Sequence, residues 1–221
     1  MIEVEKNATR FFTGSPSKHM AFLISFGSEA ELLQDSTGET AASGLDGLRV
    51  RASPVGILPG PVPTASQPRG TILFDAVALA ATEKLQREVG RKAIVIITDG
   101  VDHGSRFTIS EAIAAAHKSD AIIYSIQYID PMYQMFGSGD GDLKKMSEET
   151  GGRLFRVGRK NSLEEIFTQI QEEMRSQYSA AYTPLNANKD GAFRKVEIKT
   201  ARKDLKVQAR KGYFATASAS N

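Results

Sequence analysis

Few residues in this chain of 221 are of a type and spacing that could support catalysis or metal binding. The three histidines, His19, His103 and His117, are scattered without the spacing of zinc ligands. The chain has no cysteine, which excludes disulfides, thiol nucleophiles, iron–sulfur clusters and cysteine-based zinc sites. It contains neither a G-x-S-x-G nucleophile motif nor a phosphate-binding P-loop. Hydrolase and nucleotide-binding chemistry therefore lack their usual signatures.

Asp99 is a candidate binding residue because of its position. It directly follows the apolar stretch 93–98, which predicts a buried strand. In open α/β sheets, ligands bind outside the carboxyl ends of the strands. A simple Asp-Gly turn at Asp99-Gly100 is an equally good interpretation. Thr71 also has two interpretations, as a hydroxyl ligand or as the N-cap of the helix that follows it.

The elements that would position these residues alternate along the chain. Short apolar stretches predict strands at 21–26, 93–98, 121–128 and 153–157, with a weaker strand at 30–34. Periodic apolar residues predict helices at 1–13, 71–89, 108–118, 142–150 and 162–174. Strands that alternate with helices indicate parallel pairing with right-handed crossovers. The sequence therefore predicts a doubly wound, mostly parallel α/β sheet, covered on both faces.

Two regions depart from this alternation. Residues 36–70 contain five of the eight prolines and have no apolar periodicity, so we expect a long irregular loop there. Apolar and polar residues alternate on both sides of Arg202-Lys203-Asp204, which predicts a half-exposed antiparallel hairpin, and 178–182 is a candidate third strand. We expect one domain over residues 1–221, with the hairpin as a C-terminal extension at 178–214.

Charge is unevenly distributed along the chain, although the net charge is only +2. Residues 189–211 have nine Lys and Arg against three Asp and Glu, which leaves a net charge of −4 on the rest. Aromatic residues do not interleave with these charges as a base-stacking surface would require, since Phe193 is the one aromatic residue of the segment. We therefore expect a solvated basic hairpin and no nucleic-acid partner. No apolar run approaches the roughly 20 residues of a membrane span, and no secretory signal peptide is visible.

Three segments together resemble successive elements of the von Willebrand factor A (VWA) domain, and most closely the bacterial VWFA-related family. They are Ala21-Phe-Leu-Ile-Ser-Phe26, Gly70-Thr71-Ile-Leu-Phe-Asp75-Ala76 and Ile94-Val-Ile-Ile-Thr-Asp99-Gly100. The family's tail is matched by Gln177-Tyr178, Tyr182-Thr-Pro184, Phe193-Arg-Lys195 and Lys211-Gly-Tyr213. The resemblance covers about residues 2–214. It implies a Rossmann-like VWA fold, an adhesion or protein-binding function, and an exported bacterial protein.

Members of the VWA family bind partners through a metal-ion-dependent adhesion site, which holds Mg²⁺. Its ligands come from a D-x-S-x-S motif after the first strand, a threonine and an aspartate, and a carboxylate of the partner completes the coordination. The resemblance places the threonine at Thr71 and the aspartate at Asp99. The motif itself is absent, since the nearest stretch, Asp35-Ser-Thr-Gly-Glu39, has the wrong fifth residue and follows the wrong strand. We therefore expect a degenerate site with poor affinity for Mg²⁺.

The strand that should carry this motif is also missing before the predicted helix at 1–13. In the family it lies between the strands matched by 21–26 and 93–98. We expect an N-terminally truncated sequence, in preference to a native five-stranded variant or a slot filled by a neighbouring chain.

The function that we expect is a protein-binding module of the VWA class, not an enzyme, with a protein partner that presents a carboxylate. One alternative is a hydrolase or nucleotide-binding enzyme on the same doubly wound sheet, because fold alone does not fix function. Another is a structural element of a larger assembly that works without metal.

Overall fold

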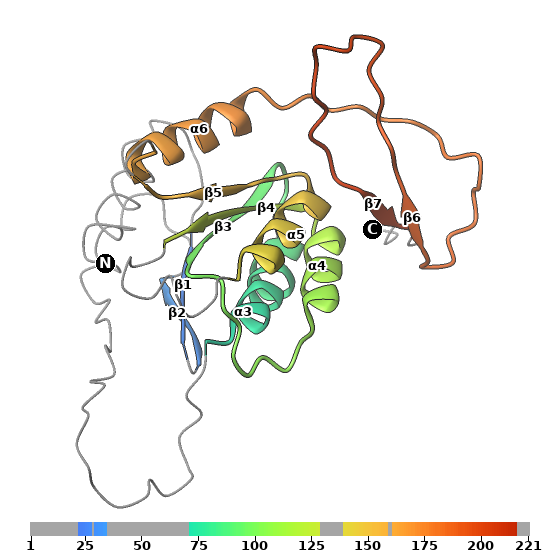
Figure 1. The fold of residues 1–221 in the computed structure, drawn as a ribbon. Helices are drawn as coiled ribbons and strands as arrows, with labels where there is room; N and C mark the ends of the chain where they lie inside the picture. Colours follow the sequence, from blue (N-terminus) through green and yellow to red (C-terminus); the bar gives the residue numbers. More distant parts are fainter. Residues whose placement is uncertain (1–21, 28, 35–70, 129–138, 159–160, 216–221) are drawn as a thin grey trace, which may run out of the picture.

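The structure is a computed structural model, and it describes residues 22–27, 29–34, 71–128, 139–158 and 161–215 (Figure 1). The predicted helix at 1–13 and the predicted loop at 36–70 lie outside these residues.

A parallel sheet forms the centre of the fold. Its strands are β3 (Lys92–Thr98), β4 (Ala121–Gln127) and β5 (Leu154–Arg156), in the order β3-β4-β5. Branched aliphatic residues dominate β3 and β4, as expected for strands that are covered on both faces. The register pairs Thr98 with Gln127. Asp99 and the end of β4 therefore meet at the same edge of the sheet.

Three helices cover one face of this sheet (Figure 1). They are α3 (Leu73–Leu79), α4 (Ile109–Lys118) and α5 (Asp140–Thr150). They share a buried apolar cluster with Ile96 of β3 and Ile123 of β4. A capping box begins α4, as the sequence predicts, with the Thr108 hydroxyl accepting from the amide of Glu111.

The fourth helix, α6 (Leu163–Arg175), covers the opposite face (Figure 1). Its apolar stripe packs against Tyr124 and Ile126, which alternate with Ile123 along β4 and so point the other way. A second predicted capping box, between Ser162 and Glu165, begins this helix. With helices on both faces, the predicted doubly wound α/β fold is confirmed.

The predicted helix at 71–89 is shorter than the sequence suggests. The α-helical part ends at Leu79, and a π-helical turn (Ala80–Lys84) and a 3₁₀ turn (Leu85–Arg87) follow. The spacing of four residues still marks the buried face as far as Leu85, which is 6% exposed, and it ends where the backbone becomes extended at Glu88. Val89, predicted on the apolar stripe, is 98% exposed beyond the last turn.

The strand at 21–26 is present but is not part of the parallel sheet. β1 (Leu23–Phe26) pairs with β2 (Ala30–Gln34) in an antiparallel hairpin. Within the described residues, no ladder joins this hairpin to β3. Phe26 packs against the apolar cluster under α3, and the carbonyl of Gly27 accepts from the amide of Ile72 at 2.8 Å.

The predicted C-terminal hairpin is confirmed at its base only. β6 (Phe193–Lys195) pairs antiparallel with β7 (Gly212–Phe214), whereas residues 196–211 between them are not strands. The candidate strand at 178–182 is also not a strand. The returning arm makes hydrogen bonds to the domain instead, from the amide of Lys211 to the carbonyl of Glu149 and from the Gln208 side chain to the carbonyl of Gly151. These long-range bonds compete with pairing between the two arms.

The hairpin base packs on α4 through an aromatic cluster. The ring of His117 lies 5.3 Å from that of Phe193 and 6.5 Å from that of Phe214, between centroids. His117 is only 7% exposed, and its Nε2 has no hydrogen-bond partner among the described residues. Desolvation is the largest cause that lowers the pKa of His117 below its usual range, and the nearby carboxylate of Glu149 opposes it.

Stability should therefore depend on pH through His117. Its pKa is lower in the folded chain than in the unfolded chain, so the unfolded chain binds the proton more readily. We expect the free energy of unfolding to be highest above about pH 6.5 and to fall as the pH drops below it. Urea unfolding at several pH values should show this slope, and His117→Leu should flatten it. His103→Leu, at an exposed histidine, is the control and should leave the slope unchanged. An unchanged slope in His117→Leu would contradict the assignment.

Candidate functional site

The candidate site is the loop at 99–107, which begins where β3 ends. Asp99 is exposed, and its Oδ1 accepts from the amide of Val101 at 3.2 Å and from the hydroxyl of Thr98 at 3.3 Å. The turn interpretation of Asp99-Gly100 is therefore correct. It does not remove the binding interpretation, because the carboxylate still faces solvent at the carboxyl edge of the sheet.

Two side chains of this loop cap the N-terminus of α3. Oδ1 of Asp102 accepts from the amide of Phe74 at 3.2 Å and from the Ser105 hydroxyl at 2.5 Å. The Ser105 hydroxyl in turn accepts from the amide of Asp75 at 3.2 Å. These bonds satisfy donors that a helix leaves open at its first turn. Side chains of the loop thus cap α3 and join the loop to this helix.

The N-cap interpretation of Thr71 is wrong. α3 begins at Leu73, and the residue at its N-cap position, Ile72, makes no side-chain cap bond. The cap comes instead from Asp102 and Ser105, about thirty positions along the chain. Ser105 is not predicted from the sequence as a capping residue, although an acidic residue followed three positions later by serine is a local turn signal.

Two further hydrogen bonds fix the loop against the start of α3. The amide of His103 donates to the carbonyl of Thr71 at 2.9 Å. The amide of Phe107 donates to Oδ1 of Asp75 at 2.8 Å. The loop is therefore held at its middle and at its far end.

A buried polar network holds the near end of the loop. Gln127, at the end of β4, is 2% exposed, and its Nε2 donates to the carbonyl of Asp99 at 3.2 Å and to Oδ1 of Asp140. Arg156, at the end of β5, binds Oδ2 of Asp140 through Nε at 3.1 Å and Nη2 at 2.6 Å. The network thus links the carboxyl ends of all three parallel strands through the first residue of α5.

Two glycines allow this close approach. A side chain on Gly139 would overlap the backbone of Gly100, and Gly100 itself has a φ of +94°. Both positions therefore need glycine for steric or conformational reasons. Close packing against Gly100 explains why residue 139 is a glycine. A dinucleotide-binding role, which a glycine-rich stretch can suggest, is not needed to explain it.

The structure brings Thr71 and Asp99 to the same loop cluster, but it does not assemble a metal site from them. Among the described residues, no hydrogen bond joins the Thr71 hydroxyl to the Asp99 carboxylate, and no three acidic or histidine side chains gather as metal ligands. Asp102, the other acidic side chain of the loop, is occupied in capping α3. One hydroxyl and one carboxylate do not fit Mg²⁺, which needs an octahedron of oxygens.

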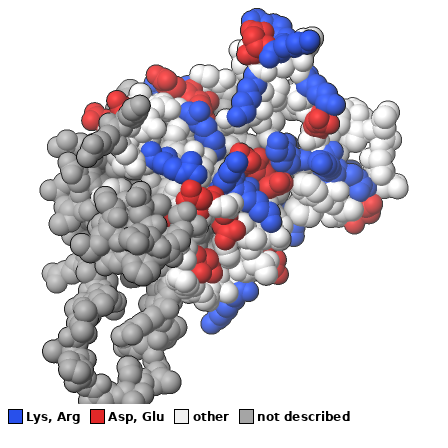
Figure 2. Space-filling model, in the orientation of Figure 1, with Lys and Arg blue, Asp and Glu red and all other residues white. Residues whose placement is uncertain are grey.

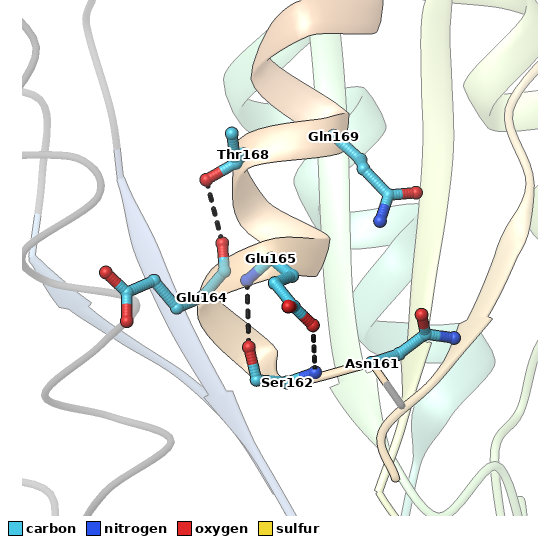
Figure 3. Close-up of a pocket in the computed structure, with 6 residues that line it drawn as sticks. All are labelled: Asn161, Ser162, Glu164, Glu165, Thr168 and Gln169. Carbon is cyan, nitrogen blue, oxygen red and sulfur yellow. Dashed lines mark hydrogen bonds between the residues drawn. The ribbon is translucent and has the colours of Figure 1, made fainter. Parts of the chain in front are cut away.

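An open hollow lies at the N-terminus of α6 and is a poor second candidate (Figure 3). The residues that line it are all polar: Asn161, Ser162, Glu164, Glu165, Thr168 and Gln169. Glu165 accepts from the amide of Ser162 at 2.8 Å, and the Ser162 hydroxyl accepts from the amide of Glu165 at 3.2 Å. The capping box therefore uses donors that could otherwise hold an anion, and the two glutamates would repel one.

Comparisons with known proteins identify the fold but no family. No protein-family profile matches the chain, and no curated protein is similar to it in sequence. An aerotolerance-related membrane protein from Bacteroides fragilis, solved with multiple mutations to serines, has a similar structure. Its TM-score is 0.56 at 16% identity, over 80% of this chain and 89% of that one.

A conserved hypothetical protein, BatB from Bacteroides thetaiotaomicron, is similar to the same degree. Its TM-score is 0.56 at 18% identity, over 79% of this chain and 88% of that one. At these identities the likeness shows a shared α/β fold. None of the helices in the described part of the chain has the length and apolar content to cross a bilayer.

Removing the shared cap should loosen the loop and α3 together. We expect Asp102→Ala to lower the free energy of unfolding by about 1 kcal/mol, because capping bonds to the first turn of α3 are lost. Ser105→Ala should have a similar effect, and the double variant should cost less than the sum because both residues act on the same turn. Chemical denaturation measures all three values. Glu172→Ala, at an exposed acidic position on α6, is the control and should stay near wild type. Fully additive losses would contradict a shared cap.

Proposed function

We propose that this chain is a protein-binding module of the VWA type that works without metal. Its binding surface is the carboxyl edge of the parallel sheet, with the exposed Asp99 carboxylate as the central contact. The observation that carries the proposal is the fixation of the 99–107 loop by hydrogen bonds to α3 and β4. The fold shared with the BatB structure supports the comparison with VWA modules.

A fixed loop suits a binding surface for an energetic reason. Ordering flexible segments on association costs free energy, and a surface that is already ordered avoids that cost. Here the carbonyl of Asp99 is held by Gln127, and the middle of the loop is held by Asp102. The Asp99 side chain is therefore presented to solvent from a backbone of defined conformation.

The negative charge of Asp99 at the carboxyl edge of the sheet indicates which kind of side chain the partner would present to it. A partner carboxylate would need a metal ion between itself and Asp99, and the residues present do not fit one. Without metal, Asp99 repels carboxylates and attracts a lysine or arginine side chain. We therefore propose a basic contact residue on the partner, in place of the carboxylate expected from the family.

An enzyme is the less favoured alternative. Catalysis by a hydrolase needs a nucleophile and a base within hydrogen-bond distance of each other. His103 is the histidine of this loop, and it contributes a backbone amide bond to Thr71. Among the described residues, no hydrogen bond connects its ring to a carboxylate or hydroxyl of the loop. These observations support binding, and a turnover assay with model esters and nucleotides would test the alternative.

Magnesium should have no effect on this protein. At physiological Mg²⁺ concentrations we expect no change in melting temperature, because only Thr71 and Asp99 remain of the family's ligand set. The measurement is a thermal unfolding series with Mg²⁺ and with a chelator. A rise in melting temperature that Asp99→Ala abolishes would show that other residues complete a metal site.

Partner binding should depend on Asp99 and be indifferent to chelator. Once a partner is captured and purified, titration calorimetry should show roughly tenfold weaker binding to Asp99→Lys, since an attractive contact becomes repulsive. Glu172→Lys makes the same charge change at an exposed position near the end of α6, close to the amino edge of the sheet, and serves as the matched control. Equal weakening in both variants would indicate a general charge effect, and chelator-sensitive binding would contradict the metal-free proposal.

A further inference from the structure

The segment between β6 and β7, residues 196–211, contacts the amino edge of the sheet through the end of its returning arm, and the rest projects away from the sheet (Figure 1). We call this segment the ribbon. Its returning arm contacts residues that come just before β4 and β5: Arg210 forms an ion pair with Asp120, and Gln208 donates to the carbonyl of Gly151. Both contacts are at the edge opposite to Asp99, because parallel strands all begin at one edge and end at the other.

Polar side chains of the ribbon make these contacts, which leaves its apolar side chains exposed. Side chains alternate between two sides along an extended chain. Val207, which directly precedes Gln208, is 40% exposed and lies on the other side of this alternation. Leu205 on the same arm and Ile198 on the other arm are each 51% exposed. The sequence suggested basic residues on the outward positions of a hairpin; the structure adds an outward apolar side.

Exposed apolar side chains are concentrated in this part of the molecule. Ten large apolar side chains are exposed in the described residues, and seven of them lie between 178 and 207. The segment before β6 contributes Tyr178, Tyr182 and Leu185, of which Tyr178 and Leu185 are fully exposed. Scattered apolar residues on a surface need no explanation, but a concentration of them marks an interaction site.

Positive charge is concentrated in the same segment (Figure 2). Residues 189–211 have a net charge of +6, with nine Lys and Arg against three Asp and Glu. The arginines and one lysine are paired: Arg194 with Asp190, Lys199 with Glu197, Arg202 with Asp204 and Arg210 with Asp120. Five lysines form no ion pair within the described residues: Lys189, Lys195, Lys203, Lys206 and Lys211.

We propose that the ribbon and the segment before it bind the surface of an anionic phospholipid bilayer. Unpaired lysines attract acidic headgroups, and exposed aliphatic side chains enter the boundary between headgroups and acyl chains. Tyrosine is favoured at that depth because its ring is apolar and its hydroxyl is polar. The binding is peripheral and requires no membrane-spanning helix.

Other binding partners of the ribbon fit these observations less well than a bilayer does. A nucleic acid would offer phosphates to the lysines but no apolar layer for the exposed side chains of Ile198, Leu205 and Val207. A second copy of the ribbon would bring two positively charged surfaces together. A bilayer combines acidic groups with an apolar layer and so matches both properties of the ribbon. Because the ribbon contacts the amino edge, a membrane-bound chain would keep the Asp99 edge free for a partner.

Vesicle co-sedimentation of the full chain tests this proposal. We compare phosphatidylcholine vesicles with vesicles that also contain about 30% phosphatidylglycerol, at low and at physiological salt. We expect at least about tenfold stronger binding to the anionic vesicles, and weaker binding as salt rises. Equal binding to both vesicles, or binding to neither, would overturn the proposal.

Two sets of variants separate the apolar from the electrostatic contribution. The triple variant Ile198→Ser, Leu205→Ser, Val207→Ser keeps the charge, and Lys195→Gln, Lys203→Gln, Lys206→Gln keeps the apolar side chains. Each should reduce binding to anionic vesicles about tenfold or more. The matched controls change an exposed apolar residue and exposed lysines elsewhere, Val89→Ser and Lys144→Gln with Lys145→Gln, and should bind as wild type does.

A check of folding and two further outcomes complete the test of membrane binding. Circular dichroism and melting temperature confirm that each variant is folded before its binding is measured. Full binding by the apolar triple variant would overturn the proposal, since purely electrostatic attraction would then account for it. Binding to short duplex DNA in place of vesicles would assign the ribbon to nucleic acid instead.

Discussion

The register between β3 and β4 is the constraint on which the rest of the candidate site depends. It pairs Thr98 with Gln127, so the carbonyl of Asp99 comes within 3.2 Å of the buried Gln127 amide. A register shift of one residue would turn Gln127 to the other face of the sheet and remove that bond. The same amide binds Asp140, which joins the β3 loop to the start of α5. One pairing thus determines how several loops are placed relative to one another.

The parts of the fold that the sequence predicts correctly are those set by local physics. The capping boxes at Thr108 and Ser162 satisfy backbone donors of a helix within four residues of sequence. A continuous apolar run such as 93–98 predicts a strand inside the domain, because an exposed strand would leave these side chains in water. Each signal is complete within a short window, so no distant residue can overrule it. Three expectations are wrong: the full length of the helix at 71–89, the candidate strand at 178–182 and the hairpin over 196–211. They depend on contacts that a short window does not contain.

The candidate site follows the same division. Asp99 could be predicted because a strand end is a local feature and its position in a parallel sheet follows from topology. The cap of α3 could not, since Asp102 and Ser105 lie about thirty residues from the helix that they cap. Gln127 was also missed, because a glutamine within an apolar strand shows its function only when its partners at Asp99 and Asp140 are known.

Hydrogen bonds hold the loops of this edge together, which is the structural role that Mg²⁺ has in the adhesion site of VWA domains. A metal ion draws loops together by binding an oxygen from each of them. Here the carbonyl of Asp99, the first turn of α3 and the start of α5 are connected through Gln127, Asp102 and Ser105. Such bonds fix the loops without concentrating positive charge between them. Under the function proposed above, the edge keeps its shape without a metal ion and presents the negative charge of Asp99, for which we propose a basic residue on the partner.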